Sequence, residues 1–237
     1  INVELGSYFT ASLGGGKRVN ELMLDALRML PVHVFHLNGW DLERWPEISG
    51  KLGKQTRVIS SNIIWPPDAG KPPARFAVRK ISLSEKQSVR FGFLGLTNPR
   101  TLKRGSRFRM RNPLQTLSAA LEKHGSKADY WIILSDLTAA AAKQMAQQHP
   151  QVIAVLLMSK TYKLFQPQQV NQAVILHSVE RGRYLGKLRL GFNQNGKITS
   201  FEPELINLNE EIRDDEKMAR RIEELKQRLK AAQSESE

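Results

Sequence analysis

The fold is decided by the stretch 128–157, ADYWIILSDLTAAAAKQMAQQHPQVIAVLL. Its apolar runs at 128–134 and 152–157 predict two buried strands, and the alanine-rich segment 139–148 between them predicts a helix. Strand, helix and strand in this order are typical of an α/β protein. Each of the two strands is followed by a short polar loop, the usual place for a site in such a fold.

The same alternation extends outward in both directions. Upstream, the spacing of apolar residues predicts helices at 20–30, 43–52 and 113–124 and strands at 32–37, 57–63, 75–83 and 89–95. Downstream, strands at 174–179, 184–193 and 197–208 follow, the last two joined by the Asn193–Gly196 turn. We therefore predict a four-layer α-β-β-α sandwich of two packed mixed sheets with helices outside.

The composition changes after residue 208. Segment 214–232 consists largely of Ala, Leu, Glu, Lys and Arg, with Met218, Ile222, Leu225 and Leu229 at helical spacing. We predict that residues 1–208 form the sandwich domain, and that 209–237 form an amphipathic linker helix with a disordered tail.

Composition bounds the remaining possibilities. The 237 residues are 41% hydrophobic, enough for a sizeable core, yet no apolar run is long enough to span a membrane. The absence of cysteine excludes disulfides and thiolate metal sites in this sequence. The chain opens on Ile1, in a segment typical of a strand already under way. We therefore expect it to begin inside a longer gene product, without the first strand of its domain.

The formal net charge of +13 favours an acidic partner or an anionic surface. The densest basic stretch is made of Arg100, Lys103, Arg104, Arg107, Arg109 and Arg111. It is interpreted as a solvated loop or as an anion-binding surface. Nucleic acid is a poor candidate partner, because Phe108 is the only aromatic residue among these cations and no known binding module is visible.

Several of these segments resemble one family. They are Val58-Ile59-Ser60-Ser61-Asn62-Ile63, Phe91-Gly92-Phe93-Leu94-Gly95-Leu96-Thr97-Asn98-Pro99 and Arg183-Tyr184-Leu185-Gly186-Lys187-Leu188. Together with the strand ends at 3–9, 36–42, 132–137 and 155–161, they are similar to the metallophosphoesterase domain of the 5'-nucleotidases, the calcineurin-like phosphoesterases. The resemblance covers nearly the whole chain. It implies an extracytoplasmic protein and, in active relatives, a pair of metals that generates a hydroxide and clamps a phosphate.

Carried over position by position, the resemblance implies a degenerate metal site. The bridging Asp of the family falls on Ser7, and its Asn-His pair falls on Asn38-Gly39 or on Gly39-Trp40. The Ser-His-Leu motif becomes Ser135-Asp136-Leu137, so a histidine is lost there as well as from the Asn-His pair. The positions concerned are Ser7, Asn38, Gly39, Trp40, Asp136, Ser159, Lys160 and Thr161.

Only Asn38 and Asp136 among these could still bind a metal, and two ligands on separate loops hold a cation poorly. We therefore predict no metal, no cofactor and no catalytic residue. The chain is expected to be a silent structural or interaction module, with a protein partner or flanking domains that could be acidic. The alternative is a metal-dependent phosphoesterase whose site is atypical or is completed by a partner.

Overall fold

The computed structural model describes residues 1–9, 16–158, 166–178 and 183–234. Its larger sheet has six strands in the order β10-β11-β9-β8-β6-β5. The four inner strands run parallel to one another, and β5 and β10 pair antiparallel at the two edges. The strands are β5 (Phe76–Ser82), β6 (Ser88–Leu96), β8 (Tyr130–Ser135), β9 (Val152–Met158), β10 (Gln168–Val170) and β11 (Ala173–Ser178).

The smaller sheet contains three parallel strands in sequence order. They are β1 (Val3–Glu4), β2 (Val34–His36) and β3 (Arg57–Ile59). Apolar side chains of β2 and β3 meet those of β6, β8 and β9 in one core cluster, so the two sheets pack face to face. Gly92 and Gly95 of β6 face large rings, and at Gly95 a Cβ would lie 2.5 Å from Cδ2 of His36.

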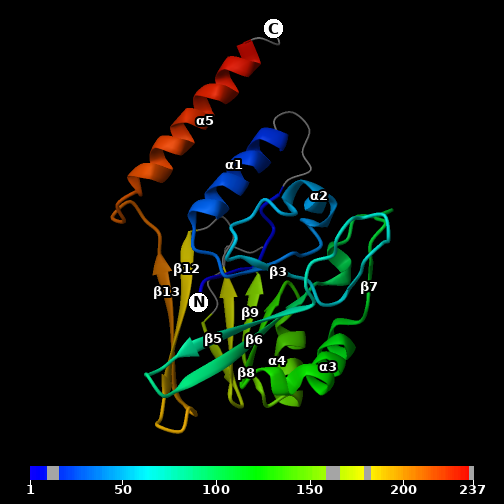
Figure 1. Ribbon diagram of the computed structural model, residues 1–237, viewed down its shortest axis with the longest axis vertical. Helices are drawn as coiled ribbons and strands as arrows, with labels where there is room; N and C mark the ends of the chain where they lie inside the picture. The colour runs from blue at the N-terminus through cyan, green and yellow to red at the C-terminus, as the bar shows by residue number, and fades with distance from the viewer. Residues whose placement is uncertain (10–15, 159–165, 179–182, 235–237) are drawn as a thin grey trace.

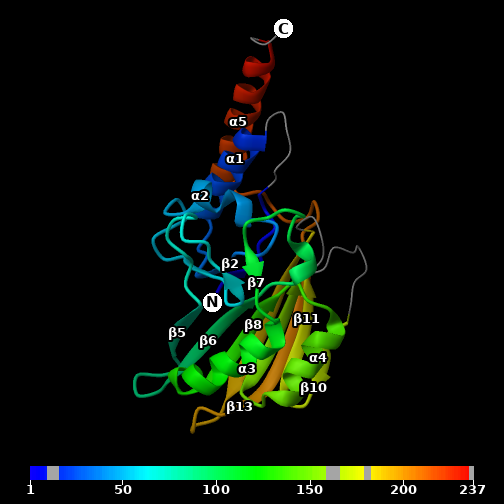
Figure 2. The same ribbon diagram turned by 90° about the vertical axis from the view of Figure 1, so that its right-hand side faces the viewer.

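Helices cover the outer face of each sheet. α3 (Pro113–His124) and α4 (Ala139–Gln148) bury Leu117, Leu121 and Met145 against the six-stranded sheet (Figure 2). On the other side, α1 (Gly16–Met29) and α2 (Trp45–Ile48) pack on the three-stranded sheet (Figure 1). The predicted four-layer sandwich is therefore confirmed.

Local sequence sets the ends of the outer helices. The side chain of Asn112 accepts from the backbone N–H groups of Leu114 and Gln115, and Pro113 opens α3 with a ring that suits the first helical position. Thr138 accepts from the N–H of Ala141 at the start of α4. The predicted helix 43–52 is shorter than expected, a 3₁₀ turn (Leu42–Arg44) followed by the single turn of α2.

Two further pairs of strands lie outside these two sheets. β12 (Tyr184–Phe192) and β13 (Ile198–Asn207) form a long antiparallel hairpin, whose Phe192 ring lies beside those of Phe91 and Tyr130. β4 (Ile63–Ile64) and β7 (Arg109–Met110) form a short ladder that the sequence did not predict.

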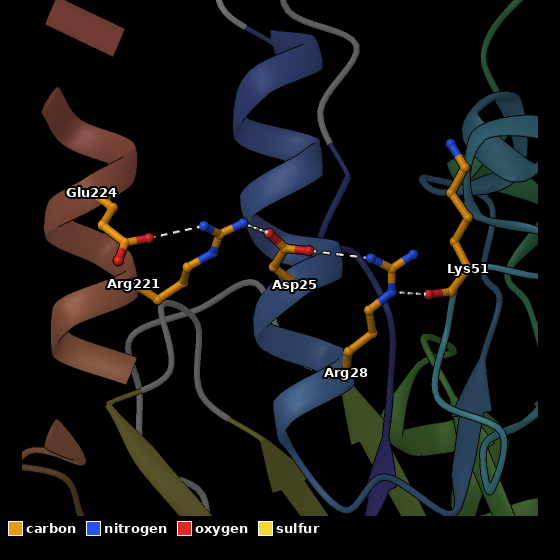
Figure 3. Close-up of polar contacts among 5 residues, drawn as sticks. All are labelled: Asp25, Arg28, Lys51, Arg221 and Glu224. Carbon is orange, nitrogen blue, oxygen red and sulfur yellow. Dashed lines mark hydrogen bonds and ion pairs between the residues drawn. The ribbon is translucent and has the colours of Figure 1, made fainter. Parts of the chain in front are cut away.

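The last helix, α5 (Glu216–Ser234), lies beside α1 and extends past it (Figure 1). Arg221 of α5 bridges Asp25 of α1 at 2.6 Å and Glu224 at 2.9 Å, and Asp25 also pairs with Arg28, which donates to the carbonyl of Lys51 (Figure 3). No described helix combines the length and the apolar character needed to cross a membrane. The division of the chain into 1–208 and 209–237 as separate units stays a prediction.

Candidate functional site

The candidate site lies where strands of both sheets end. The loop after β2 reaches the loop after β1, since Asn38 Nδ2 donates to the carbonyl of Leu5 at 3.0 Å. The loop after β8 reaches the loop after β6, since Asp136 accepts from Asn98. The tertiary structure thus brings together Ser7, Asn38, Gly39 and Asp136, which are far apart in the sequence.

Asn38 is fully buried, and both ends of its amide are engaged. Its Oδ1 accepts from the backbone N–H of Trp40 at 3.0 Å, and its Nδ2 also lies 3.7 Å from Sδ of Met158. A metal ligand would have to present Oδ1 to the cation. In this structure that oxygen accepts one hydrogen bond and so stabilises the turn that follows β2.

Asp136 is engaged in the same way by the loop after β6. One carboxylate oxygen accepts from the backbone N–H of Asn98 at 2.5 Å, and the other accepts from the hydroxyl of Thr101 at 3.2 Å. The residue is 9% exposed, so these bonds compensate for most of its lost hydration. Its role in this structure is to hold the loop 98–101 to the end of β8.

Ser7 takes part through its backbone, not as a metal ligand. It has φ of 73°, next to Gly6 with φ of 80°, so the chain turns sharply after β1. The N–H groups of Ser7 and Phe9 donate to the two oxygens of Asp41, at 2.6 and 3.0 Å. Asp41 is fully buried, and this burial raises its pKa from 3.8 to about 6 despite those hydrogen bonds.

Gly39 faces the loop after β6, and Trp40 follows it in the chain. A Cβ at Gly39 would lie 2.3 Å from Oγ1 of Thr101, so only glycine allows the two loops this close. Trp40 is 37% exposed at the surface beside this contact. That these positions correspond to a lost histidine of the family stays a prediction.

The nearest histidine along β2 serves the core. His36 is fully buried between the sheets, with Nε2 3.2 Å from the Thr97 hydroxyl and Nδ1 unbonded among the described residues. Burial lowers the pKa of His36 to about 3, so the imidazole is neutral at physiological pH. His177 is likewise buried, and burial lowers its pKa as well.

These residues do not fit a pair of divalent metals. The two possible donors, Asn38 and Asp136, already bind the protein's own backbone and hydroxyl groups. Within the described part of the chain, no three His, Cys, Asp or Glu side chains gather as a potential metal site. The predicted positions Ser159, Lys160 and Thr161 lie outside the described residues.

The basic stretch begins in the loop that follows β6. The side chains of Arg100, Lys103, Arg104, Arg107, Arg109 and Arg111 are all exposed. Phe108 between them is 2% exposed, with its ring 5.0 Å from that of Trp65. The stretch is therefore a segment anchored to the core, with its charges directed to solvent.

Solved structures share this arrangement of sheets and helices. The chain aligns with a 5'-nucleotidase precursor from Thermus thermophilus at a TM-score of 0.78 and 16% identity, over 97% of this chain and 49% of the other. The fold is that of the 5'-nucleotidases. The sulfate thiohydrolase SoxB of the same species aligns at 0.73 and 16% identity, over 94% of this chain and 42% of that one.

The NAD nucleotidase of Haemophilus influenzae aligns at a TM-score of 0.65 and 14% identity, over 95% of this chain and 46% of the other. The chain thus spans about half the length of the proteins it matches, and at these identities the likeness concerns the fold alone. The sequence itself matches no protein-family model and no curated protein.

Some residues of this region could not be found from sequence. Thr101 and Asn98 bind Asp136, and Asp41 binds the loop after β1, yet neither arrangement has a motif. The available signals were position, because Asn98 and Thr101 come just after the predicted strand 89–95 and Asp41 just after 32–37, and the family resemblance of the segments 91–99 and 36–42.

Proposed function

We propose that this chain is a catalytically silent domain with the 5'-nucleotidase fold, and that it acts as a structural or interaction module of a larger protein or complex. One observation supports the proposal: the two side chains that we expected could still bind a metal are engaged by the protein itself. Asn38 Oδ1 binds the Trp40 amide, and both oxygens of Asp136 bind the loop 98–101. A cation would compete with these hydrogen bonds for the same oxygens, and one amide and one carboxylate supply few of the anionic donors that a pair of divalent cations requires.

The test measures catalysis and metal binding separately. A nucleoside monophosphate and nitrophenyl phosphate are incubated with the chain and added Mn²⁺ or Zn²⁺, and we expect turnover no higher than the buffer blank. Elemental analysis of the purified chain should find no stoichiometric metal. A metal that binds the folded state at a hundred times its dissociation constant would add about 2.7 kcal/mol of stability, so we expect the melting temperature to stay flat.

The variant Asp136→Ala decides between the proposal and its alternative. If the chain hydrolyses phosphoesters in a metal-dependent way and Asp136→Ala abolishes it, the chain is a phosphoesterase with an atypical site and the proposal is wrong. Asp129→Ala is the matched control, because that carboxylate pairs with Arg90 at the surface and is 40% exposed.

We also propose that the module works outside the cytoplasm. The support is the matched protein from Thermus thermophilus, which is described as a precursor and so as a protein from which a segment is removed. Fractionation of the producing cells with an antibody to this chain tests the placement. Recovery with cytoplasmic markers alone would contradict it.

A further inference from the structure

The basic segment 100–111 carries charge that the fold does not neutralise. It contains six Lys or Arg and no Asp or Glu. In the described structure only Arg107 has an acidic partner, Asp68 at 3.2 Å. The five other cations are Arg100, Lys103, Arg104, Arg109 and Arg111. Like charges concentrated in twelve residues repel one another, so an anionic partner would stabilise the segment.

The segment is held in place at several points, which distinguishes it from a freely solvated loop. Asn98 caps its first turn by accepting from the N–H of Arg100, and Ser106 donates to Glu43 at 2.8 Å. Phe108 is buried, and Arg111 donates from its backbone to the carbonyl of Asn62. A partner that meets a backbone already held in place loses less conformational entropy on binding than one that must order the whole segment.

The ladder of β4 and β7 adds an apolar contact to these cations. Ile64 pairs directly with Arg109, and Ile63 pairs with Met110. Ile63 is buried, whereas Ile64 is 42% exposed, so the outward face of the ladder presents Ile64 beside Arg109. Arg111 is two residues further along the same strand direction, about 7 Å away, and also points outward.

This pattern suits an extended acidic peptide. Alternate side chains of an extended chain are also about 7 Å apart, so carboxylates at every second position can reach Arg109 and Arg111. Exposed Ile64 offers a contact for an apolar side chain among those carboxylates. A single-stranded nucleic acid needs several exposed rings on which successive bases stack. Phe108 within the segment is buried, and Trp40 beside it offers a single ring at 37% exposure.

We propose that the segment 100–111, together with Ile64, is a docking surface for an acidic, extended segment of a partner protein. The inference rests on the proposed function, because it names the partner class of the interaction module. The surface adjoins the loops of the candidate site, since Thr101 of the segment contacts both Gly39 and Asp136. Docking here would cover the edge of the fold at which an enzyme of this architecture would admit substrate.

The binding experiment uses a fluorescein-labelled peptide in which Glu alternates with Ser around one central Leu. A second peptide replaces the Leu by Ser, and an unlabelled single-stranded oligonucleotide of the same net charge serves as competitor. Fluorescence anisotropy with the full chain should give saturable binding of the Leu peptide that weakens as salt screens the charges.

Three variants distinguish binding at this surface from attraction by the overall net charge. Arg109→Glu should weaken binding of the Leu peptide about tenfold or more, because it places a like charge against the peptide's carboxylates. Ile64→Ser should weaken the Leu peptide about threefold to fivefold and leave the Ser peptide unchanged. Lys143→Glu, an exposed lysine on α4, makes the same change of net charge and should alter binding less than about twofold. Circular dichroism confirms that each variant is folded.

Each remaining outcome is decisive. Equal losses in Arg109→Glu and Lys143→Glu would reduce the effect to overall charge and overturn the docking surface, as would no binding at all. Displacement of the peptide by the oligonucleotide at lower concentration would assign the surface to nucleic acid instead. The turnover assay on the same samples tests the proposed function independently: hydrolysis refutes the silent module, whereas absent hydrolysis with absent peptide binding refutes the docking surface alone.

Discussion

Asp41 should make the free energy of unfolding fall as pH rises, which is the opposite of the usual effect of a carboxyl group. Burial raises the pKa of its carboxyl from 3.8 to about 6. Between these values the folded chain holds a proton that the unfolded chain has released, so the free energy of unfolding falls as pH rises. The loss is about 1.4 kcal/mol for each pH unit, so the chain loses about 3 kcal/mol of stability between the unfolded and the folded pKa of Asp41. Above the folded pKa the loss is complete.

The variant Asp41→Asn removes this titration and leaves one acceptor oxygen for the loop after β1. Urea unfolding of both proteins, followed by tryptophan fluorescence, gives the difference in unfolding free energy at each pH. Subtracting the two curves cancels groups that titrate in both, among them His36. We expect the variant to gain about 3 kcal/mol relative to the parent between about pH 4 and about pH 7.

A matched carboxyl provides the control. The pKa of Asp129 is lowered chiefly by its hydrogen bond to Arg90, so its stabilisation is present at neutral pH and is lost as pH falls. Asp129→Asn should therefore show a difference of the opposite sign. A difference curve for Asp41→Asn that is flat, or that slopes like the control, would refute the reasoning that burial dominates at Asp41.

Three further outcomes are expected. Gly95→Ala should lower the free energy of unfolding in urea by about 1–3 kcal/mol, because the added Cβ would lie 2.5 Å from the ring of His36. Gly186→Ala is the control and should change little, because a Cβ there meets nothing within 4 Å. Equal losses in the two variants would contradict the close packing of the sheets. Phe108→Ala should lower the free energy of unfolding by about 3–5 kcal/mol, since the ring is buried in the core cluster formed with α1, α2 and β2. A loss below about 1 kcal/mol would show that the basic segment is not anchored to that cluster. Asp25→Ala breaks the partly exposed ion pair from α1 to Arg221 of α5. The unfolding free energy should therefore fall by about 1 kcal/mol or less while hydrogen exchange in α5 accelerates, and unchanged exchange would show that this pair does not hold the helix.

Much of the fold could be predicted from local sequence pattern. The strands 128–134 and 152–157 and the helix 139–148 appear as β8, β9 and α4 with ends shifted by a residue or two. Periodic apolar residues work well here because strands buried on both faces are continuous apolar runs, and helix ends carry caps such as Asn112. The ladder of β4 and β7 was missed because two-residue strands have no period to detect.

The same distinction between local sequence and tertiary structure applies to the candidate site. Sequence by itself determined which residue types stand at the strand ends, and hence that Ser7, Gly39 and Trp40 offer neither a carboxylate nor an imidazole. Only the tertiary structure decided what Asn38 and Asp136 do. The oxygen of a carboxylate or an amide can either ligate a metal or accept from a backbone N–H, because both use its lone pairs. Which of these occurs depends on the groups that folding brings within hydrogen-bond distance, and for Asp136 those groups lie 35 and 38 residues away in the chain.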